Sequence, residues 1–219
     1  MTELELNGRS IPVDVYMRRV RHIYLRILPG PRLELVMPGH CNTSVDEVLA
    51  SKRRWIEKKT AEMANARELV TAGSFLFRGR NYAVQTASGR NEVAMNGNNA
   101  TIFLRPRSKA AAVLRRFLAA ETLAYASDRA SRFCRELGVS FRNITTREMR
   151  KWGYCTRDGK LCFNWRLICL PPELAEYIVL HESLHLKHFN HSKRFKTALA
   201  RLLPDYRRRE ISLRSYLTN

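Results

Sequence analysis

Hydrophobic and polar residues alternate in short runs through the first part of the chain. Six of these runs are rich in the β-branched and large apolar residues that favour strands, and turn-forming residues separate them. They cover residues 4–6, 11–17, 23–28, 33–37, 74–86 and 92–104. This pattern predicts an amino-terminal part that is β-rich and antiparallel.

Two longer segments have the spacing of helices instead. Ser44 and Glu47 have the spacing of a capping box, so a helix is expected to begin there and to extend to about Leu69. From residue 108 to Leu137, apolar residues recur every three or four positions, and Gly138 follows as a helix terminator. The second segment predicts one long helix.

A hairpin and two further helices are expected near the carboxyl end. Residues 152–155 and 161–167 favour strands, and the Asp-Gly pair between them is a strong hairpin signal. Pro172 and the acid after it suit the first turn of a helix. Residues 192–203 predict another helix, which Pro204 ends.

The change from strand to helix patterns sets the expected fold class and domain organisation. The boundary is expected near Pro106, because helical spacing dominates after it. We therefore predict an α+β fold in a single unit of residues 1–219. Residues 1–106 form its β-rich subdomain, and residues 107–219 form a helical subdomain in which a β-hairpin precedes the helix that begins at Pro172.

A cluster of histidines in the Pro172 helix carries the strongest chemical signal. His181, Glu182 and His185 form the sequence H-E-x-x-H, and on a helix the two histidines lie one turn apart on the same face. Catalytic zinc usually has three protein ligands, and His191 after the expected turn is the best third candidate. His188 is the rival, although three histidines along one straight helix span about 10 Å, too far for one tetrahedral ion.

The competing explanation is that these histidines are ordinary core residues. His188 is expected to be such a hydrogen-bonded core residue, or to have an outer-shell or surface role. For His181, Glu182 and His185 it would bury two imidazoles and a carboxylate without a compensating charge, which is costly. A bound cation removes this cost, so the sequence predicts a Zn²⁺ site.

Three stretches also carry a family resemblance. Residues 147–155, 162–167 and 190–195, in that order around the histidine cluster, resemble the YgjP-like metallopeptidases, and weaker likeness at residues 52–56 and 77–82 extends over most of the chain. The metal-binding pattern is similar to that of the SprT-like and Wss-like proteases associated with DNA–protein crosslinks. The resemblance implies a zincin-like catalytic part.

The site residues that this resemblance implies are the same ones. His181, His185 and His191 would be the zinc ligands and Glu182 the general base. Three positions depart from the common pattern, namely Tyr154 in place of serine, Ser183 in place of an apolar residue, and Lys196 in place of tryptophan. None of these departures removes a ligand.

The expected activity is hydrolysis of peptide bonds. Zinc-activated water would attack the carbonyl and Glu182 would transfer the proton, with Tyr154, Tyr206 and Arg166 as unassigned candidates for the oxyanion donor. A strand of the hairpin could hold an extended peptide if it lies at a sheet edge. The alternatives are a nucleic-acid-binding protein with a structural zinc, and a polypeptide-binding protein without turnover, against which the retained Glu182 argues.

Composition adds an expectation about partners and location. The chain has 39 Lys and Arg against 20 Asp and Glu, a formal net charge of +19. Such a field attracts polyanions, so nucleic acid is a candidate partner beside a protein or peptide substrate, although a basic surface without a specific ligand is equally compatible. Pairs and triplets of cations occur at residues 18–19, 52–54, 115–116 and 207–209.

The apolar content and the cysteines indicate the compartment. There is no run of eighteen apolar residues and no signal-peptide pattern, so we expect a cytoplasmic protein without a membrane span. Five cysteines without a C-x-x-C pair are expected to be reduced thiols rather than zinc ligands, although Cys155 and Cys162 could face each other across the hairpin.

Overall fold

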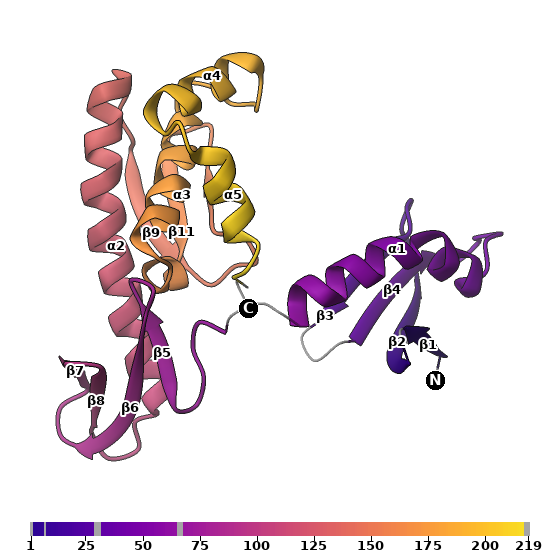
Figure 1. The fold of residues 1–219 in the computed structure, drawn as a ribbon, viewed down its shortest axis with the longest axis horizontal. Helices are drawn as coiled ribbons and strands as arrows, with labels where there is room; N and C mark the ends of the chain where they lie inside the picture. The colour runs from indigo at the N-terminus through magenta and orange to yellow at the C-terminus, as the bar shows by residue number, and fades with distance from the viewer. Residues whose placement is uncertain (1, 7, 29–31, 65–67, 217–219) are drawn as a thin grey trace. The chain divides into compact units, whose positions relative to one another are not determined.

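The chain folds into two compact units with an α+β composition, which confirms the expected fold class (Figure 1). The computed structural model describes residues 2–6, 8–28, 32–64 and 68–216, with the side chains of residues 62–64 left aside. The first unit is Met1–Ala66 and the second is Arg67–Asn219. Each unit has its own hydrophobic core.

The first unit is a four-stranded sheet with one helix. Its strands are β1 (Thr2–Leu6), β2 (Arg9–Arg18), β3 (Tyr24–Leu28) and β4 (Arg32–Pro38), in the order β1-β2-β4-β3. The expectation of an antiparallel sheet was wrong in one respect, because β2 and β4 run parallel. The cause is that β3 pairs with the far edge of β4, so that β4 enters the sheet beside β2 in the same direction.

Helix α1 (Val45–Ala64) begins at the predicted capping box. The Ser44 hydroxyl accepts from the Glu47 backbone N–H at 3.2 Å, and the Glu47 carboxylate accepts from the Ser44 N–H at 2.9 Å. Ile56 is fully buried in the core of this unit. The expected end near Leu69 was too late, since Leu69 and Val70 are not helical; the residues between Ala64 and Glu68 lie outside the described part.

The second unit opens with a sheet of the same topology. Its strands are β5 (Ser74–Phe77), β6 (Arg80–Ser88), β7 (Glu92–Asn96) and β8 (Asn99–Leu104), in the order β5-β6-β8-β7 with β6 and β8 parallel. Residues 74–86, which were predicted as one strand, belong to the two strands β5 and β6. The chain turns back between them because Arg78 and Gly79 both have positive φ (51° and 78°).

This second sheet shares a core with the long helix that follows it. Helix α2 (Ala110–Leu137) packs on β7 and β8 and ends at Gly138, whose φ of 65° is the left-handed conformation that the sequence predicted there. The observed boundary therefore lies at residues 66/67 rather than near Pro106. Ala100, Ile102, Val113 and Leu118 belong to one continuous buried cluster, which joins the strands to the helix.

A three-stranded sheet and a short helix come next. The strands are β9 (Asn143–Arg147), β10 (Gly153–Cys155) and β11 (Lys160–Asn164), in the order β10-β11-β9, followed by the 3₁₀ helix η1 (Trp165–Cys169). The antiparallel β10–β11 pair is the predicted hairpin. The sequence analysis did not anticipate β9, which pairs with β11 in parallel.

Three helices complete the second unit (Figure 1). They are α3 (Pro172–Leu184), α4 (Lys193–Leu202) and α5 (Tyr206–Leu213). The first two match the predicted helices and α5 was not anticipated. Helix α3 packs against α2, α4 and α5. None of the described helices is both long enough and apolar enough to cross a bilayer.

All five cysteines are free thiols. The hairpin register pairs Tyr154 with Cys162 and Cys155 with Leu161, so the two hairpin cysteines point to opposite faces rather than toward each other. Trp165 is almost fully buried, and Trp152 packs against the same core, which agrees with a packing role for both tryptophans.

Candidate metal centre

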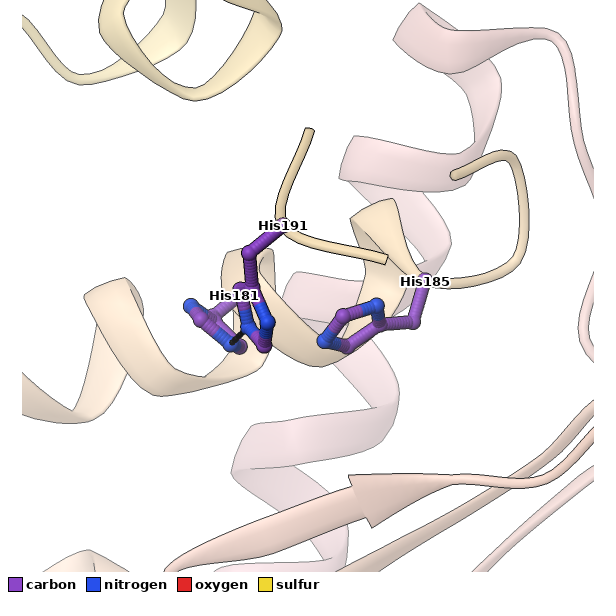
Figure 2. Close-up of side chains that lie close together, drawn as sticks. All are labelled: His181, His185 and His191. Atoms are coloured by element: carbon purple, nitrogen blue, oxygen red, sulfur yellow. Dashed lines mark hydrogen bonds between the residues drawn. The ribbon is translucent and has the colours of Figure 1, made fainter. Parts of the chain in front are cut away.

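The carboxyl end of α3 carries the histidine cluster. The helix begins at Pro172 and ends at Leu184, and His185 is its C-cap residue. His181 is therefore one turn before the end of the helix and His185 is at its end, so both imidazoles project from the same face (Figure 2). The helix is shorter than a straight run through His188 would require.

The loop between α3 and α4 brings His191 back to this face (Figure 2). The Nε2 atoms of His181 and His191 are 2.9 Å apart, and one ligand nitrogen from each of His181, His185 and His191 lies within 4.8 Å of the others. Two imidazoles that share a zinc ion at about 2.0–2.1 Å with tetrahedral angles have nitrogens about 3.3 Å apart. The His181–His191 pair reaches this spacing with a shift of a few tenths of an ångström, and the widest separation in the group closes to it with a side-chain movement of up to about 1.5 Å.

A backbone carbonyl orients one of the imidazoles. The Nδ1 atom of His185 lies 3.0 Å from the carbonyl oxygen of His188. Donation to this carbonyl places the proton on Nδ1 and leaves the lone pair of Nε2 available to a metal ion, an arrangement that is usual for zinc-binding histidines. The contact of His188 with the cluster is thus made by its backbone, and its ring is not part of the ligand group.

The surroundings of His181 keep its imidazole neutral. Burial, followed by the nearby His185 and His191, lowers the pKa of His181 to about 4. Burial also lowers the pKa of His185. The Nδ1 atom of His181 is buried and has no hydrogen-bond partner among the described residues, so its polar contact is made at Nε2. Neutral imidazoles are the form that binds metal ions.

Phe195 forms an apolar wall behind the cluster. Its ring is 1% exposed and lies 4.8–5.0 Å, centroid to centroid, from the rings of His181, His185 and His191. It belongs to the first turn of α4, so the same helix that follows His191 also supplies the packing that holds the three rings. An apolar wall of this kind lowers the local dielectric and strengthens the binding of a cation by its ligands.

Glu182 lies between α3 and the hairpin and is only 9% exposed. A Cβ atom on Gly153 would lie 2.9 Å from the Glu182 Cγ atom, so β10 passes directly against this side chain. Burial raises the pKa of Glu182 to about 7, against the positive charge of Lys151 and a hydrogen bond from the backbone of Cys155, which both lower it. A carboxylate held in this way is poised to exchange a proton near neutral pH.

The three candidate oxyanion donors have other contacts. Arg147 donates to the Tyr154 hydroxyl at 3.4 Å, and Arg166 pairs with Glu148 at 3.0 Å. Gly153 points toward Glu182, so the neighbouring Tyr154 side chain leaves the opposite face of β10. Tyr206 accepts from the guanidinium of Arg207 at 3.3 Å.

Several residues at the centre escaped the sequence analysis. Gly153 of β10 lies against the Glu182 side chain, and the charge of Lys151 lowers the pKa of Glu182. Tyr177 packs edge-on against His181 with ring centroids 5.8 Å apart. Tyr177 precedes His181 by four residues, so helical spacing places it on the same stripe of the helix as His181, although its contact with the imidazole was not anticipated. The hairpin residues have no such local signal, because their contact with α3 depends on tertiary packing.

The departures from the common pattern are accommodated at two positions. Ser183 is fully buried, and its hydroxyl donates to the Val179 carbonyl one turn earlier at 2.7 Å, so the polar group is satisfied inside the helix. Lys196 lies on the exposed side of α4. Neither side chain belongs to the ligand group.

Comparison with known protein families gives a match that covers part of the first unit and nearly all of the second. The chain matches the YgjP-like metallopeptidase domain over residues 21–216. No curated protein matches it.

Proposed function

Since the chain belongs to the YgjP-like metallopeptidase family, we propose that it is a zinc-dependent peptidase whose ligands are His181, His185 and His191 and whose general base is Glu182. A peptidase domain implies a peptide or protein substrate. The observation that carries the proposal is the convergence of three imidazole nitrogens within 4.8 Å beside a buried glutamate of the same helix.

The donor set supports zinc as the metal. Imidazole nitrogens suit zinc, and three neutral ligands leave the ion its full positive charge. When bound, zinc lowers the pKa of a water molecule toward neutrality and polarises a carbonyl group. The hydrogen bond of His185 to the His188 carbonyl and the wall formed by Phe195 keep the imidazoles in position for this role.

Glu182 supplies the proton transfer. Its carboxylate accepts the proton of the attacking water and delivers that proton to the nitrogen of the leaving amine, so that one group serves as base and then as acid. A pKa near 7 suits both steps, since the group is neither a permanent acid nor a permanent base at neutral pH. Lys151 and the backbone of Cys155 hold the ionised form in place.

We propose that the substrate peptide binds along the outer edge of β10. Among the described strands, β10 is the edge strand of its sheet and β11 pairs with its other side. An extended peptide that adds to this edge gains main-chain hydrogen bonds, which are independent of the peptide sequence. Because Gly153 of β10 touches Glu182, a peptide along this edge would run close to the general base.

The alternative of a structural zinc in a nucleic-acid-binding protein has less support. Structural zinc sites have four protein ligands. Within the described part of the chain, the group of ligand atoms that could hold one ion contains three histidines and no fourth residue. A three-ligand site leaves a coordination position for water or substrate, as catalysis requires.

The positive charge of the chain suggests that nucleic acid holds some of the protein substrates. The charge is uneven, because residues 67–219 contain 28 Lys and Arg against 12 Asp and Glu, whereas residues 1–66 contain 11 against 8. The excess therefore belongs to the unit that holds the metal centre. We propose that proteins bound to nucleic acid are among the substrates, since shared attachment raises the local substrate concentration.

The substitution Glu182→Gln tests the proposed chemistry. The amide has nearly the same shape but cannot accept the proton of water, so we expect peptide hydrolysis to fall by about 10²–10⁴-fold while the bound zinc stays stoichiometric. Hydrolysis of a peptide library by the zinc-loaded protein, with elemental analysis, measures both quantities. Glu136→Gln, on the exposed face of α2, is the matched control. Full activity of Glu182→Gln would refute the general-base role.

A further inference from the structure

Helix α4 carries a dense group of cations beside the metal centre. Its exposed positions include Lys193, Arg194, Lys196 and Arg201, and its inward positions Phe195 and Leu199 are buried. The chain contains no Asp or Glu from residue 183 to residue 204. The four side chains form no ion pair or hydrogen bond with any described residue, so their charge faces solvent uncompensated. We name these four residues the α4 cations.

The surface on both sides of α4 is hollowed. One hollow of about 620 Å³ lies between α4 and the end of α2, where its lining includes Lys187, Leu137 and Ala198 beside three of the α4 cations. A second hollow of about 600 Å³ lies toward α5 and is lined by Lys193 and Lys196, with Tyr206 and Arg207 across from them. Neither lining contains a carboxylate. Both hollows therefore suit an elongated anion.

An exposed aromatic residue stands next to this surface. Phe189 directly follows His188, which lines the first hollow, and its side chain is 63% exposed. It is among the most exposed large apolar side chains of the described residues. Exposed aromatic rings beside a row of cations are the combination with which proteins bind single-stranded nucleic acid, because bases stack on the ring while the cations follow the phosphates.

The arrangement of apolar and basic residues on α4 argues against a lipid membrane as the partner of this helix. An amphipathic helix that binds lipid must expose an apolar face to the acyl region. The apolar face of α4 is already buried in the core by Phe195 and Leu199, and the α4 cations occupy the side that remains. The pattern of a buried apolar face and a purely basic outer face fits a hydrated polyanion better than a bilayer.

We infer that the outer face of α4, together with Phe189, is a binding surface for single-stranded nucleic acid. The α4 cations extend over nine residues, about 12 Å of helix, so they contact a short stretch of phosphates. Lys193 follows the proposed ligand His191 by two positions, so a strand on α4 passes beside the metal centre. The inference rests on the proposed function only in its consequence, namely that a protein attached to the strand is presented to that centre.

Binding of labelled oligothymidine to the full-length protein tests this surface without any turnover. One variant replaces all four α4 cations by alanine, and a matched control replaces Arg9, Arg18, Arg19 and Arg21 of the first unit, which removes the same charge. We expect the α4 variant to weaken binding at least tenfold and to reduce the slope of log Kd against log salt by about 3, at about 0.7 per phosphate contact. The control should change the affinity by less than about threefold.

Two further measurements keep the test decisive. Phe189→Ala should weaken binding of the single strand more than binding of a duplex, because only unpaired bases stack on the ring. Circular dichroism and zinc content establish that each variant is folded. Equal losses in the α4 variant and the control, no binding by the wild-type protein at 50 mM salt, or equal affinity for anionic lipid vesicles would overturn the inference. Each of these results would leave the peptidase proposal intact, since zinc binding and hydrolysis by Glu182 are measured separately.

Discussion

The chain contains two β-sheet modules of the same topology, and they serve different ends. Strands β1–β4 with helix α1, and strands β5–β8 with helix α2, share one strand order, one parallel pair at the centre and a hairpin at each side. In both modules the first hairpin contains a glycine with positive φ, Gly8 at 75° and Gly79 at 78°, followed by arginine. The repeat is visible in the pairing of strands, although no repeat was recognised in the sequence.

The two modules differ most in what their helices bury. Helix α1 has 20 residues and, among its described side chains, buries Val48, Leu49 and Ile56. Helix α2 has 28 residues and is buried at intervals from Val113 to Leu137. The extra length of α2 extends beyond its own sheet and packs against η1, β9 and α3.

This difference explains why only one module supports a metal centre. Near the middle of α2, the Thr122 hydroxyl donates to the Trp165 carbonyl at 2.7 Å and accepts from the Ile168 N–H at 3.2 Å, which fixes η1 on the helix. The segment from η1 to α3 is then held beside the hairpin. In the first module, the buried cluster of the described residues consists of residues from its own strands and from α1. A common topology therefore provides a scaffold, and the helix length determines what can be added to it.

The largest expected effect distinguishes histidines of the two units. His191→Ala should lower zinc affinity by about three orders of magnitude, about 4 kcal/mol, more than the 10–100-fold that loss of an outer-shell partner costs. His188→Ala should retain most of the metal, because its backbone carbonyl makes the contact with His185. His22→Ala in the first unit should have no effect. Zinc titration with a competing chelator measures all three, and the opposite ranking of His191 and His188 would reject the ligand assignment.

A smaller effect, in stability, tests whether the two units fold independently. Ile56→Ala and Leu118→Ala each remove a fully buried side chain, so each should lower the free energy of unfolding of its own unit by about 3 kcal/mol. Only Leu118→Ala should also weaken zinc binding, since Leu118 and Phe195 belong to one core. Denaturant unfolding followed by tryptophan emission reports the first unit in a background with Trp152→Phe and Trp165→Phe, where Trp55 remains, and it reports the second unit in a Trp55→Phe background. A single transition in which both variants shift both signals equally would show that the units are coupled.

The smallest expected effect concerns the contact between the hairpin and Glu182. Gly153→Ala places a methyl group 2.9 Å from the Glu182 Cγ atom, so β10 or the carboxylate must move. We expect a loss of about 1–2 kcal/mol of stability and a fall in hydrolysis with zinc retained. Gly39→Ala in the first unit is the control, because its added Cβ meets no atom within 4 Å and its φ is not positive. Unchanged activity in Gly153→Ala would mean that the carboxylate does not need its observed position.

Local rules account for much of what could be predicted. The capping box at Ser44 and Glu47, the glycine that ends α2 and the Asp-Gly hairpin depend on residues close together in sequence, and all three were found where expected. The convergence of His181, His185 and His191 was also predictable, because helical spacing and one turn suffice to bring them together. Their role as zinc ligands stays a prediction.

The sequence by itself therefore determined the α+β class, helices α1 to α4 and the histidine cluster, each of which depends on short-range geometry. Tertiary structure alone decided the parallel central strands, the boundary at residue 66, and the contact of Glu182 with β10. The physical reason is that these features join segments far apart in the chain, and the pairing of such segments depends on how buried faces fit together rather than on any local pattern. The cations of α4 were not among the clusters noted in the sequence, because they are spaced along a helix, and only the burial of Phe195 and Leu199 showed that they share its outer side.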